Sequence, residues 1–485
     1  MRLSRAVARA RNGLPVLHAP SRQQTPLLTR AVSSSSPSSA PVNTSSSLPT
    51  IGSQPRRLLS SSNTATTRIL PVRTARRHYA SSSAGPLNKT ALYDLHLANG
   101  AKVVPFGGFE MPVQYSGLGV SASHHWTRNK ASLFDVGHMV QHFFSGPGAA
   151  AFLERLTPGS IAALPPHRST LSALLWPGTG GIVDDTIITR LPDDPAGEPL
   201  FYVVTNAACR DKDLAYFDEQ KAAWDGPAFK HQVPDDRGLI ALQGPLSQGI
   251  LEGLAATNLK DLYFGQSRYV TANIDGVGEA TLLISRGGYT GEDGFEISIP
   301  TPEATVAATR ALLESAGPEK LQLAGLGARD SLRLEAGMCL YGHDLDDTTT
   351  PVEASLRWIV GRDRRGTTEL ADGAFHGAAV VLAQLTPKNK GGRGVERQRV
   401  GLVVEGAPAR EGAEIWSVGE EAKRVGVVTS GCPSPTLGKN IAMGYVADGL
   451  HKAGTELRVV VRGRPQKATV EKMPFVPAKY WKEAP

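Results

Sequence analysis

Residues 287–299 read Gly-Gly-Tyr-Thr-Gly-Glu-Asp-Gly-Phe-Glu-Ile-Ser-Ile. Four glycines within eight residues permit turns closed to other residues and let the backbone approach a ligand closely. Apolar and polar residues then alternate, which predicts a strand over 295–299 with Phe295 on one face and Glu296 on the other. A carboxylate placed there can accept two hydrogen bonds from a planar group with adjacent N–H donors, such as a guanidinium or a 2-amino-pyrimidinone ring. A β-hairpin with a solvated acidic turn fits this stretch equally well.

The first ninety residues differ in composition from the rest of the chain. They carry twelve Arg and one Lys but no Asp or Glu, and they are rich in Ser, Thr, Ala and Pro. This composition is typical of an organelle transit peptide, although a basic tail that binds nucleic acid is an alternative. Arg2, Arg5 and Arg9 fit one face of an amphipathic helix. Residues 77–81 resemble a mitochondrial processing site, so we predict a transit peptide over residues 1–79, with a flank to about 89, and a mitochondrial location.

The remainder of the chain has no net basic charge. The whole sequence is +7, but residues 91–485 hold 39 basic and 45 acidic residues. The basic excess therefore belongs to the N-terminal segment, and the case for nucleic-acid binding falls with its removal. The three cysteines lack the spacing of a disulfide framework or a zinc site. The sequence contains no run of about eighteen apolar residues, so we expect no membrane span.

Strands and helices mix along residues 90–382 without a regular βαβ repeat, which predicts an α+β fold rather than a doubly wound sheet. Strand-like runs lie at 201–205, 239–242, 280–285 and 295–299, and helical runs at 149–156, 209–223 and 302–315. Beyond a Gly/Lys-rich bridge at 383–398, short strands separated by Gly/Pro turns predict a small all-β domain over 395–485. Its six strands are expected at 399–405, 413–417, 424–429, 441–446, 456–461 and 468–472.

Two segments place charged side chains where burial is expected. Asp184 and Asp185 interrupt an apolar β run, so alternation turns them to opposite faces and buries at least one of them. A buried carboxylate is costly unless it is paired or functional, and burial raises its pKa. A structural Asp that accepts backbone N–H bonds is the alternative. Residues 328–337 predict a helix with Arg329 and Arg333 one turn apart, for which a solvated i,i+4 charge network is the alternative.

A series of longer motifs follows in order along residues 92–480. They include Leu92-Tyr93-Asp94, Pro112-Val113-Gln114-Tyr115, Ser132-Leu133-Phe134-Asp135-Val136, Ala241-Leu242-Gln243-Gly244-Pro245, Gly288-Tyr289-Thr290-Gly291-Glu292-Asp293-Gly294, Arg329-Asp330-Ser331-Leu332-Arg333-Leu334-Glu335, Thr350-Pro351-Val352-Glu353, Thr429-Ser430-Gly431-Cys432-Pro433-Ser434-Pro435 and Met473-Pro474-Phe475-Val476-Pro477. Together these motifs resemble the T-protein (aminomethyltransferase) family of the glycine cleavage system. The resemblance covers essentially the whole chain after the predicted transit peptide.

The resemblance implies three domains around a central folate-binding hole: two intertwined α+β domains in 90–382 and a β-barrel in 395–485. Members of this family take an aminomethyl group from the lipoyl arm of the H-protein and release ammonia. They pass the one-carbon unit to tetrahydrofolate as 5,10-methylenetetrahydrofolate, without a metal, flavin or nicotinamide. Expected partners are the lipoylated H-protein and, functionally, the P-protein and the L-protein of the mitochondrial matrix. Neither a nucleic acid nor a membrane is expected to bind.

The resemblance also assigns roles to individual positions. The family's essential aspartate falls on Asp185, which would orient the folate and stabilise positive charge on the departing aminomethyl nitrogen. The family's substrate-binding glutamate falls on Glu296, its arginine on Arg329 and its C-terminal tyrosine on Tyr480. Further pocket-lining positions, and an arginine near the lipoyl entrance, fall on Tyr289, Met139, Trp358 and Arg399.

Two related classes of protein are alternatives. Folate-binding relatives that act in iron–sulfur cluster assembly carry a Lys-Gly-Cys-Tyr-x-Gly-Gln-Glu signature. Residues 286–293 read Arg-Gly-Gly-Tyr-Thr-Gly-Glu-Asp and lack its cysteine. The folate half of a dimethylglycine or sarcosine dehydrogenase would need an N-terminal FAD domain with a GxGxxG loop, which residues 1–90 cannot supply.

Overall fold

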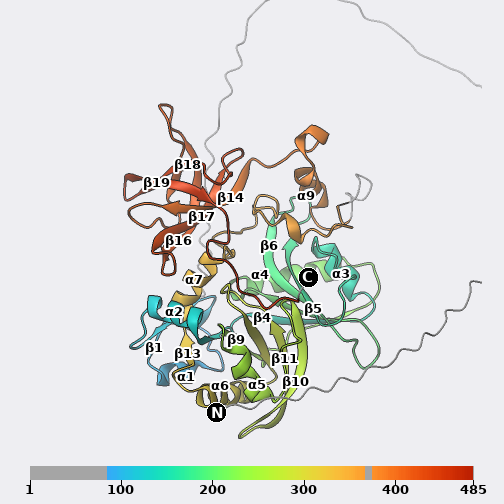
Figure 1. The fold of residues 1–485 in the computed structure, drawn as a ribbon. Coiled ribbons are helices and arrows are strands. Elements are labelled where there is room, and N and C mark those ends of the chain that lie inside the picture. Colours follow the sequence, from blue (N-terminus) through green and yellow to red (C-terminus); the bar gives the residue numbers. More distant parts are fainter. Residues whose placement is uncertain (1–84, 366–373, 484–485) are drawn as a thin grey trace, which may run out of the picture. The chain divides into compact units, whose positions relative to one another are not determined.

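A computed structural model describes residues 85–365 and 374–483 (Figure 1). The predicted transit peptide, residues 1–79, lies outside the described residues. Helices and strands mix along the described chain, which confirms the predicted α+β class. Within these residues, no helix combines the length and the apolar character that a membrane crossing needs.

The helical elements are α1 (Tyr93–Ala98), α2 (Val120–Asn129), α3 (Ala149–Leu156), η1 (Ala207–Cys209), α4 (Arg210–Ala222), α5 (Ser247–Ala255), α6 (Pro302–Ala316), α7 (Leu326–Glu335), η2 (Arg357–Ile359), α9 (Ala378–Leu385) and η3 (Lys388–Lys390). The strands before the barrel are β1 (Ala101–Phe106), β2 (Phe109–Tyr115), β3 (Ala131–Asp135), β4 (Val140–Ser145), β5 (Arg168–Leu175), β6 (Ile182–Leu191), β7 (Leu200–Thr205), β8 (Lys230–Gln232), β9 (Gly238–Gln243), β10 (Gln266–Ile274), β11 (Gly278–Arg286), β12 (Gly294–Ile299) and β13 (Leu321–Ala324). The barrel strands are β14 (Arg397–Val404), β15 (Glu414–Trp416), β16 (Arg424–Ser434), β17 (Lys439–Ala447), β18 (Glu456–Val461) and β19 (Arg464–Glu471).

Local sequence explains where α6 begins and ends, close to the predicted 302–315. The Thr301 hydroxyl accepts a hydrogen bond from the Ala304 amide at 3.2 Å, and Pro302 occupies the first turn. Both features are favoured at helix starts, because a side-chain oxygen caps a free N–H and proline has none to lose. The helix stops at Gly317, whose φ of +73° favours glycine.

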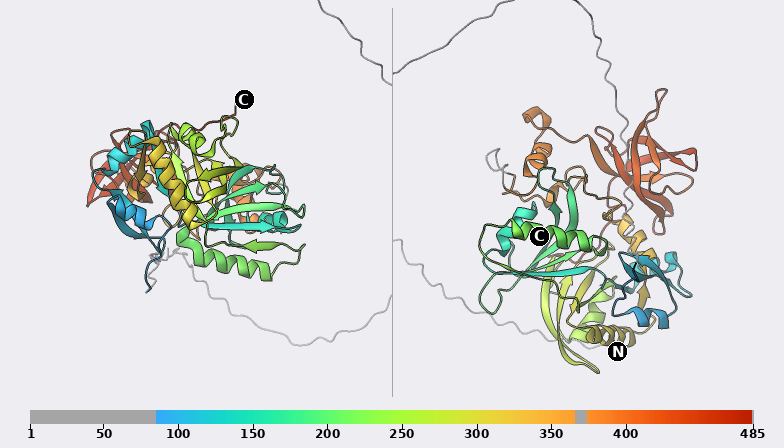
Figure 2. Two further views of the ribbon diagram at one scale, coloured as in Figure 1. Left: turned by 90° about the horizontal axis from the view of Figure 1, so that it is seen from below. Right: turned by 180° about the vertical axis from the view of Figure 1, so that it is seen from behind.

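The main sheet has eleven strands in the order β13-β3-β9-β12-β11-β10-β5-β6-β7-β4-β8. Its two halves meet at one residue pair, Gln266 of β10 opposite Arg168 of β5. Helices α5 and α6 pack on one face of the β13-to-β10 half. Helices α3 and α4 pack on one face of the β5-to-β8 half (Figure 2). Each half therefore buries its own helix-covered face.

The other faces of both halves share one apolar cluster, which we call the inner cluster. Its buried members are Phe134, Val136, Leu191, Tyr202, Val204, Leu239, Ala241, Leu283, Ala324, Ala328 and Leu332. They come from strands of both halves and from α7, so the sheet curls until its two halves face common neighbours. Two of the predicted site residues, Asp185 and Glu296, lie on strands that border this inner face.

The C-terminal strands close into a barrel in the order β14-β17-β16-β15-β18-β19 (Figure 1). All six strands expected from the sequence are present, so the predicted small all-β domain is confirmed. Alternate residues of β14, Val400, Leu402 and Val404, lie in its apolar core. The barrel is tied to α7 by a hydrogen bond of 2.9 Å from Arg333 Nη2 to Ser430 Oγ.

Candidate active site

Glu296 lies on the inner face of the curled sheet. Its cross-strand neighbour on β9 is Ala241, a member of the inner cluster. Phe295, Ile297 and Ile299 point the other way, into the core beneath α5 and α6. The alternation predicted for this strand is therefore confirmed.

The glycine-rich loop before β12 is pinned by buried contacts. At Gly288, with a φ of +156°, an added Cβ would lie 2.0 Å from the side-chain oxygen of Gln243. Glu292 is only 1% exposed and pairs with Arg128 at 3.0 Å. Asp293 pairs with the buried Arg286. A hairpin does join β11 and β12, but its acidic turn is not solvated as the alternative had it.

Arg329 of α7 is the cation associated with Glu296. Its guanidinium lies 4.6 Å from the centroid of the Tyr289 ring, and its Nη1 is buried without a hydrogen-bond partner among the described residues. Burial raises the pKa of Glu296, and the Arg329 charge opposes part of that rise. Burial lowers the pKa of Arg329, against the opposing effect of Glu296. The pair thus offers an acceptor and a donor in a desolvated setting.

Tyr289 connects this pair with the aspartates of β6. Its hydroxyl donates a hydrogen bond to the backbone carbonyl of Cys339. Burial raises the pKa of Tyr289, and the negative charge of Asp185 raises it further. The positive charge of Arg329 lowers it, so the ring lies within electrostatic range of both groups.

Asp184 and Asp185 face opposite sides of β6, as alternation predicted. Asp184 is fully buried and shares its face with Ile188, which packs beneath α3 and α4. Asp185 is half-buried and shares its face with Leu191 of the inner cluster. Asp185 and Glu296 therefore lie on the same inner face.

Asn206 links the two aspartates, although no motif in the sequence singles it out. Its Nδ2 donates to Asp184 Oδ1 and to Asp185 Oδ1, each at 2.9 Å, and its backbone N–H donates to Asp184 Oδ2 at 2.8 Å. Strand β7 pairs with β6 so that Val204 lies opposite Ile187. Continuing that register places Asn206 beside Asp185. The place of Asn206 beside Asp185 can be inferred only once the register of β6 and β7 is known.

The pKa of the Asp185 carboxyl group is raised toward neutral pH. Burial and the adjacent Asp184 charge raise the pKa of Asp185 to about 7, although the Asn206 hydrogen bond opposes the shift. A carboxyl group with such a pKa can hold or release a proton near physiological pH. Perturbed pKa values of this kind cluster at functional sites.

Behind Asp184, three polar groups meet beneath α4. Among the described residues, the ligand-type atoms of Asp184, Cys209 and Asp213 lie within 4.8 Å of one another. Both Asp184 oxygens already accept hydrogen bonds from Asn206. Burial and the charge of Asp184 raise the pKa of the Cys209 thiol, so the cluster offers no thiolate. Its chemistry suits a shared proton better than a metal cation.

Tyr480 and Met139 reach the site region in different ways. Tyr480 stacks on Phe264, with ring centroids 4.1 Å apart, and burial raises the pKa of Tyr480 to about 12. Its segment is held by a hydrogen bond of 2.8 Å from the Lys479 amide to the carbonyl of Gly291 in the glycine loop. Met139 packs against the inner cluster.

Trp358 and Arg399 lie in other settings. Trp358 is 58% exposed in η2 and, in the described part of the chain, makes no hydrogen bond with the groups above. Arg399 is buried and donates to the backbone carbonyls of Ala354 at 2.8 Å and Gly337 at 3.1 Å. The structure therefore brings Asp185, Tyr289, Glu296 and Arg329 together, and gives Arg399 backbone contacts instead.

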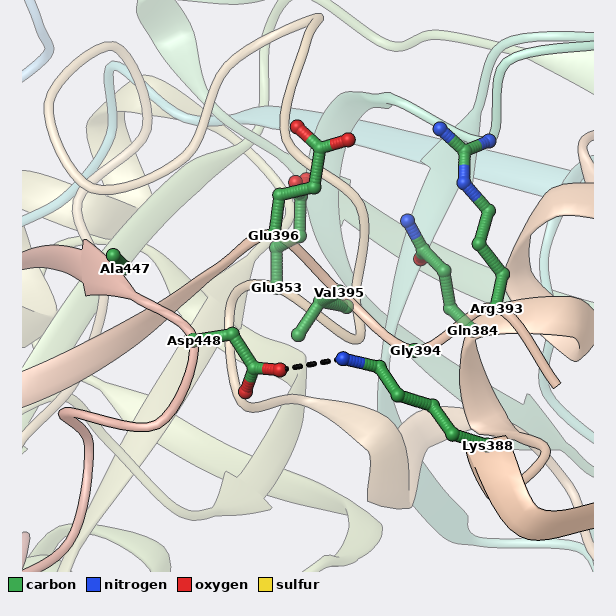
Figure 3. Close-up of a pocket in the computed structure, with 9 residues that line it drawn as sticks. All are labelled: Glu353, Gln384, Lys388, Arg393, Gly394, Val395, Glu396, Ala447 and Asp448. Carbon is green, nitrogen blue, oxygen red and sulfur yellow. Dashed lines mark hydrogen bonds and ion pairs between the residues drawn. The ribbon is translucent and has the colours of Figure 1, made fainter.

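A surface cavity of about 440 Å³ lies away from these residues (Figure 3). Its lining residues are Glu353, Gln384, Lys388, Arg393, Gly394, Val395, Glu396, Ala447 and Asp448. A 2.8 Å ion pair joins Lys388 and Asp448 at its edge. Its wall mixes both charges and includes none of the predicted site residues, so it offers no evident selectivity for the expected ligand.

Comparison with known protein families covers most of the chain. Residues 92–364 match the family described as "GCVT N-terminal domain". Residues 397–477 match the "Glycine cleavage T-protein C-terminal barrel domain". The two matches fall on the curled-sheet region and on the barrel.

Individual relatives align over nearly their full length. The chain is 48% identical over 408 residues to "Probable aminomethyltransferase, mitochondrial" of Schizosaccharomyces pombe, covering 84% of this chain and 97% of the relative. It is 45% identical to "Aminomethyltransferase, mitochondrial" of Saccharomyces cerevisiae, covering 82% and 96%. A solved structure, "glycine cleavage system aminomethyltransferase T from Bartonella henselae", aligns with a TM-score of 0.71 and 37% identity, covering 82% of this chain and all of that one.

Proposed function

Because the chain belongs to the glycine cleavage T-protein (aminomethyltransferase) family, we propose that it transfers a one-carbon unit from aminomethyl-lipoyl H-protein to tetrahydrofolate. The products would be ammonia and 5,10-methylenetetrahydrofolate. Family membership makes the chain an enzyme of the glycine cleavage system, and relatives named mitochondrial agree with the predicted location. The reaction details and the residue roles below are our proposal.

One observation carries the folate assignment. Arg329 Nη1 is buried without a hydrogen-bond partner in the described chain, and none of the described hydrogen bonds reaches the Glu296 carboxylate. Buried polar groups normally have partners, so the unsatisfied buried donor of Arg329 indicates a ligand that completes it, and the half-buried Glu296 carboxylate offers that ligand an acceptor. The 2-amino-pyrimidinone edge of a pterin presents adjacent N–H donors suited to a carboxylate. We therefore place the pterin ring against Glu296, with Arg329 as a second contact.

Asp185 is proposed as the catalytic carboxylate. It shares the inner face with Glu296, and Asn206 holds its Oδ1 at 2.9 Å. In its ionised form it would stabilise positive charge that develops on the departing aminomethyl nitrogen, because a fixed anion acts strongly in a desolvated site. A pKa of about 7 also allows it to hold a proton at this position.

The remaining assignments extend the pocket. Tyr289 would line it beside Arg329, whose guanidinium the ring already stacks against. Tyr480 would close it from the C-terminal segment, and Met139 would contribute apolar wall from the inner cluster. The lipoylated H-protein is the proposed donor, with the P-protein and L-protein as functional partners.

The iron–sulfur assembly alternative meets a steric obstacle. Its signature requires a cysteine at the position of Gly288. A Cβ there would lie 2.0 Å from Gln243, a fully buried side chain. A cysteine at this position would therefore require Gln243 to move from its buried place.

An assay with purified components tests the proposed reaction. The chain from residue 80 onward, supplied with tetrahydrofolate and aminomethylated H-protein, should form methylenetetrahydrofolate and ammonia, and it should form none when the donor is omitted. Asp185→Asn should lower turnover by about 10²-fold or more while leaving folate affinity within about twofold. Full activity in this variant would remove Asp185 from its role.

Folate binding is tested separately by calorimetry. Glu296→Gln should raise the dissociation constant for tetrahydrofolate by about 10-fold or more, because a charged acceptor is replaced by a neutral one. Glu279→Gln on the exposed start of β11 is the matched control. An unchanged dissociation constant in Glu296→Gln would place the pterin elsewhere.

A further inference from the structure

Asp213 is a buried carboxyl group without an evident structural partner. It projects from the first turn of α4 on the face that packs with Tyr216 and Phe217, and it is fully buried. Neither of its carboxyl oxygens has a hydrogen-bond partner of normal geometry among the described residues. Its acidic neighbour is Asp184, which has one carboxylate oxygen within 4.8 Å of an oxygen of Asp213.

The surroundings of these two carboxyl groups decide where charge can reside. Two buried carboxylates at this separation cannot both be ionised, because neither is solvated and each repels the other. Asp184 accepts two N–H hydrogen bonds from Asn206, at 2.8 and 2.9 Å, which stabilise its ionised form. Within the described chain no N–H group donates to Asp213, and the hydroxyl of Thr205, which lowers the Asp213 pKa, forms no hydrogen bond of normal geometry with it. A single proton shared by the pair therefore resides on Asp213.

The other groups around Asp213 do not reverse this assignment. Lys212 is the nearby cation, but its ammonium pairs with Asp347 at 3.1 Å and contacts the Tyr341 ring. Cys209 of η1 is a neutral thiol, and Tyr216 of α4, the helix that carries Asp213, is also neutral. On the β7 side Thr205 lies beside Asp213, and beyond it His142 of β4 is kept neutral, because burial and then His231 lower its pKa to about 3.

We propose that Asp213 is a positioning residue that carries a proton at neutral pH, donates it in a hydrogen bond to Asp184, and thereby holds the Asn206 bridge that orients Asp185. The proposal rests on the catalytic role assigned to Asp185 above. Burial, and then the charge of Asp184, raise the pKa of Asp213 well above its usual range, in agreement with this placement of the proton.

Two substitutions separate this role from a simple packing role. Asp213→Asn keeps a donor that can reach Asp184 without adding charge, so kcat should stay within about threefold of the wild type. Asp213→Leu has similar size but no donor, so Asn206 and Asp185 lose their fixed geometry. Its kcat should fall by about 10- to 100-fold. Because Glu296 is untouched, the KM for tetrahydrofolate should stay within about twofold in both variants.

The pH profile provides a readout that packing alone would not change. Without a donor at position 213, the ionised form of Asp184 loses a stabilising hydrogen bond, so the pKa of Asp184 rises and its negative charge is reduced. That charge is second only to burial in raising the pKa of Asp185. In Asp213→Leu the acid limb of kcat against pH should therefore move to lower pH, whereas Asp213→Asn should keep the wild-type limb.

Infrared difference spectroscopy tests the proton directly and needs no activity. In an Asp185→Asn background, the carbonyl stretch of a protonated carboxylic acid should be present at pH 7 and should disappear when Asp213→Asn is added. Its persistence in the double variant would overturn the proposal. A failure of Asp185 in the activity assay would leave this band in place, so the two failures can be told apart.

Three other outcomes also overturn the proposal. Asp213→Asn could lose as much activity as Asp213→Leu, which would mean that the negative charge of Asp213 is needed. Asp213→Leu could fold and keep both the wild-type kcat and its pH limb, which would make Asp213 dispensable. Metal analysis of the purified protein could find one equivalent of a divalent ion that is lost in Asp213→Asn, which would make the cluster a cation site.

Discussion

Asp185→Asn should increase the stability of the protein above neutral pH while removing its activity. Burial and the Asp184 charge raise the pKa of Asp185 from 3.8 to about 7. A shift of about three pH units corresponds to an upper bound of about 4 kcal/mol at roughly 1.4 kcal/mol per unit. Asp185 is half-buried and water screens part of the repulsion, so we expect a gain of about 1–3 kcal/mol. Asparagine can present its side-chain oxygen to Asn206, so the local geometry is retained.

The sign of this effect follows from proton binding. Below about pH 4 the carboxyl group is protonated in both the folded and the unfolded state, so it has no differential effect. As pH rises toward 7, the unfolded chain releases this proton while the folded chain keeps it, and the wild type loses stability. Asparagine has no proton to release. The difference between Asp185→Asn and the wild type should therefore grow from pH 5 to pH 8.

Thermal unfolding across this pH range provides the measurement. We expect Asp185→Asn to raise the midpoint by several degrees at pH 8 and by clearly less at pH 5. Asp275→Asn in the exposed turn between β10 and β11 is the matched control, and it should show no pH-dependent difference. A variant that is less stable than the wild type at pH 8 would refute the reasoning, because it would mean that the Asp185 charge is stabilised in the folded state.

Gly288→Ala should lower the free energy of unfolding by about 2–3 kcal/mol, since its Cβ overlaps a buried neighbour. Gly253 of α5 has open space around it, so Gly253→Ala should not lower the free energy of unfolding measurably in the same denaturation experiment. Burial raises the pKa of Glu335, but hydrogen bonds from neighbouring side chains outweigh this effect and lower it to about 2. Glu335→Gln should cost about 3 kcal/mol at pH 7, and the loss should shrink as pH falls from 5 toward 2. Tyr480→Phe keeps the ring stack, so it should leave the unfolding midpoint unchanged while raising the KM for tetrahydrofolate; an unchanged KM would take the hydroxyl out of the pocket.

The sequence predicted the elements well where a single segment carries the pattern. The alternating residues of β12 and the six short barrel strands are of this kind, because periodicity and turn residues lie within the segment itself. The same holds for α3, which spans the expected 149–156. The eleven-strand order, in contrast, depends on pairings between distant segments such as β3 with β9 and β10 with β5, and no local pattern encodes them.

The sequence singled out candidate site residues, but it did not show which residues contact one another there. Alternation correctly separated Asp184 from Asp185, yet it could not supply Asn206, which reaches them only through the register of β6 and β7. Residues 328–337 gave a helix as expected, but the alternative of a solvated charge network is wrong for Arg333, which is buried and paired. Exposure at Trp358 depends on packing around η2, which the sequence does not reveal.

Hydrogen-bond saturation separates Glu335, an acid that serves the fold, from Glu296, an acid that we propose binds the ligand. Glu335 accepts from Arg128, Ser434 and Thr436, and its pKa is low in spite of burial. Such a carboxylate has no capacity left for a ligand and serves the fold. Glu296 is half-buried, none of the described hydrogen bonds reaches it, and burial raises its pKa.

The same criterion explains the glycine-rich loop. Its own acids, Glu292 and Asp293, are saturated by Arg128, Lys479 and Arg286, so they hold the loop and the C-terminal segment in place. The glycine-rich loop, whose sequence best identifies the family, therefore serves mainly to fix the backbone in place. The carboxylates that we propose to act on the ligand lie just beyond it, Glu296 on β12 and Asp185 across the inner face on β6.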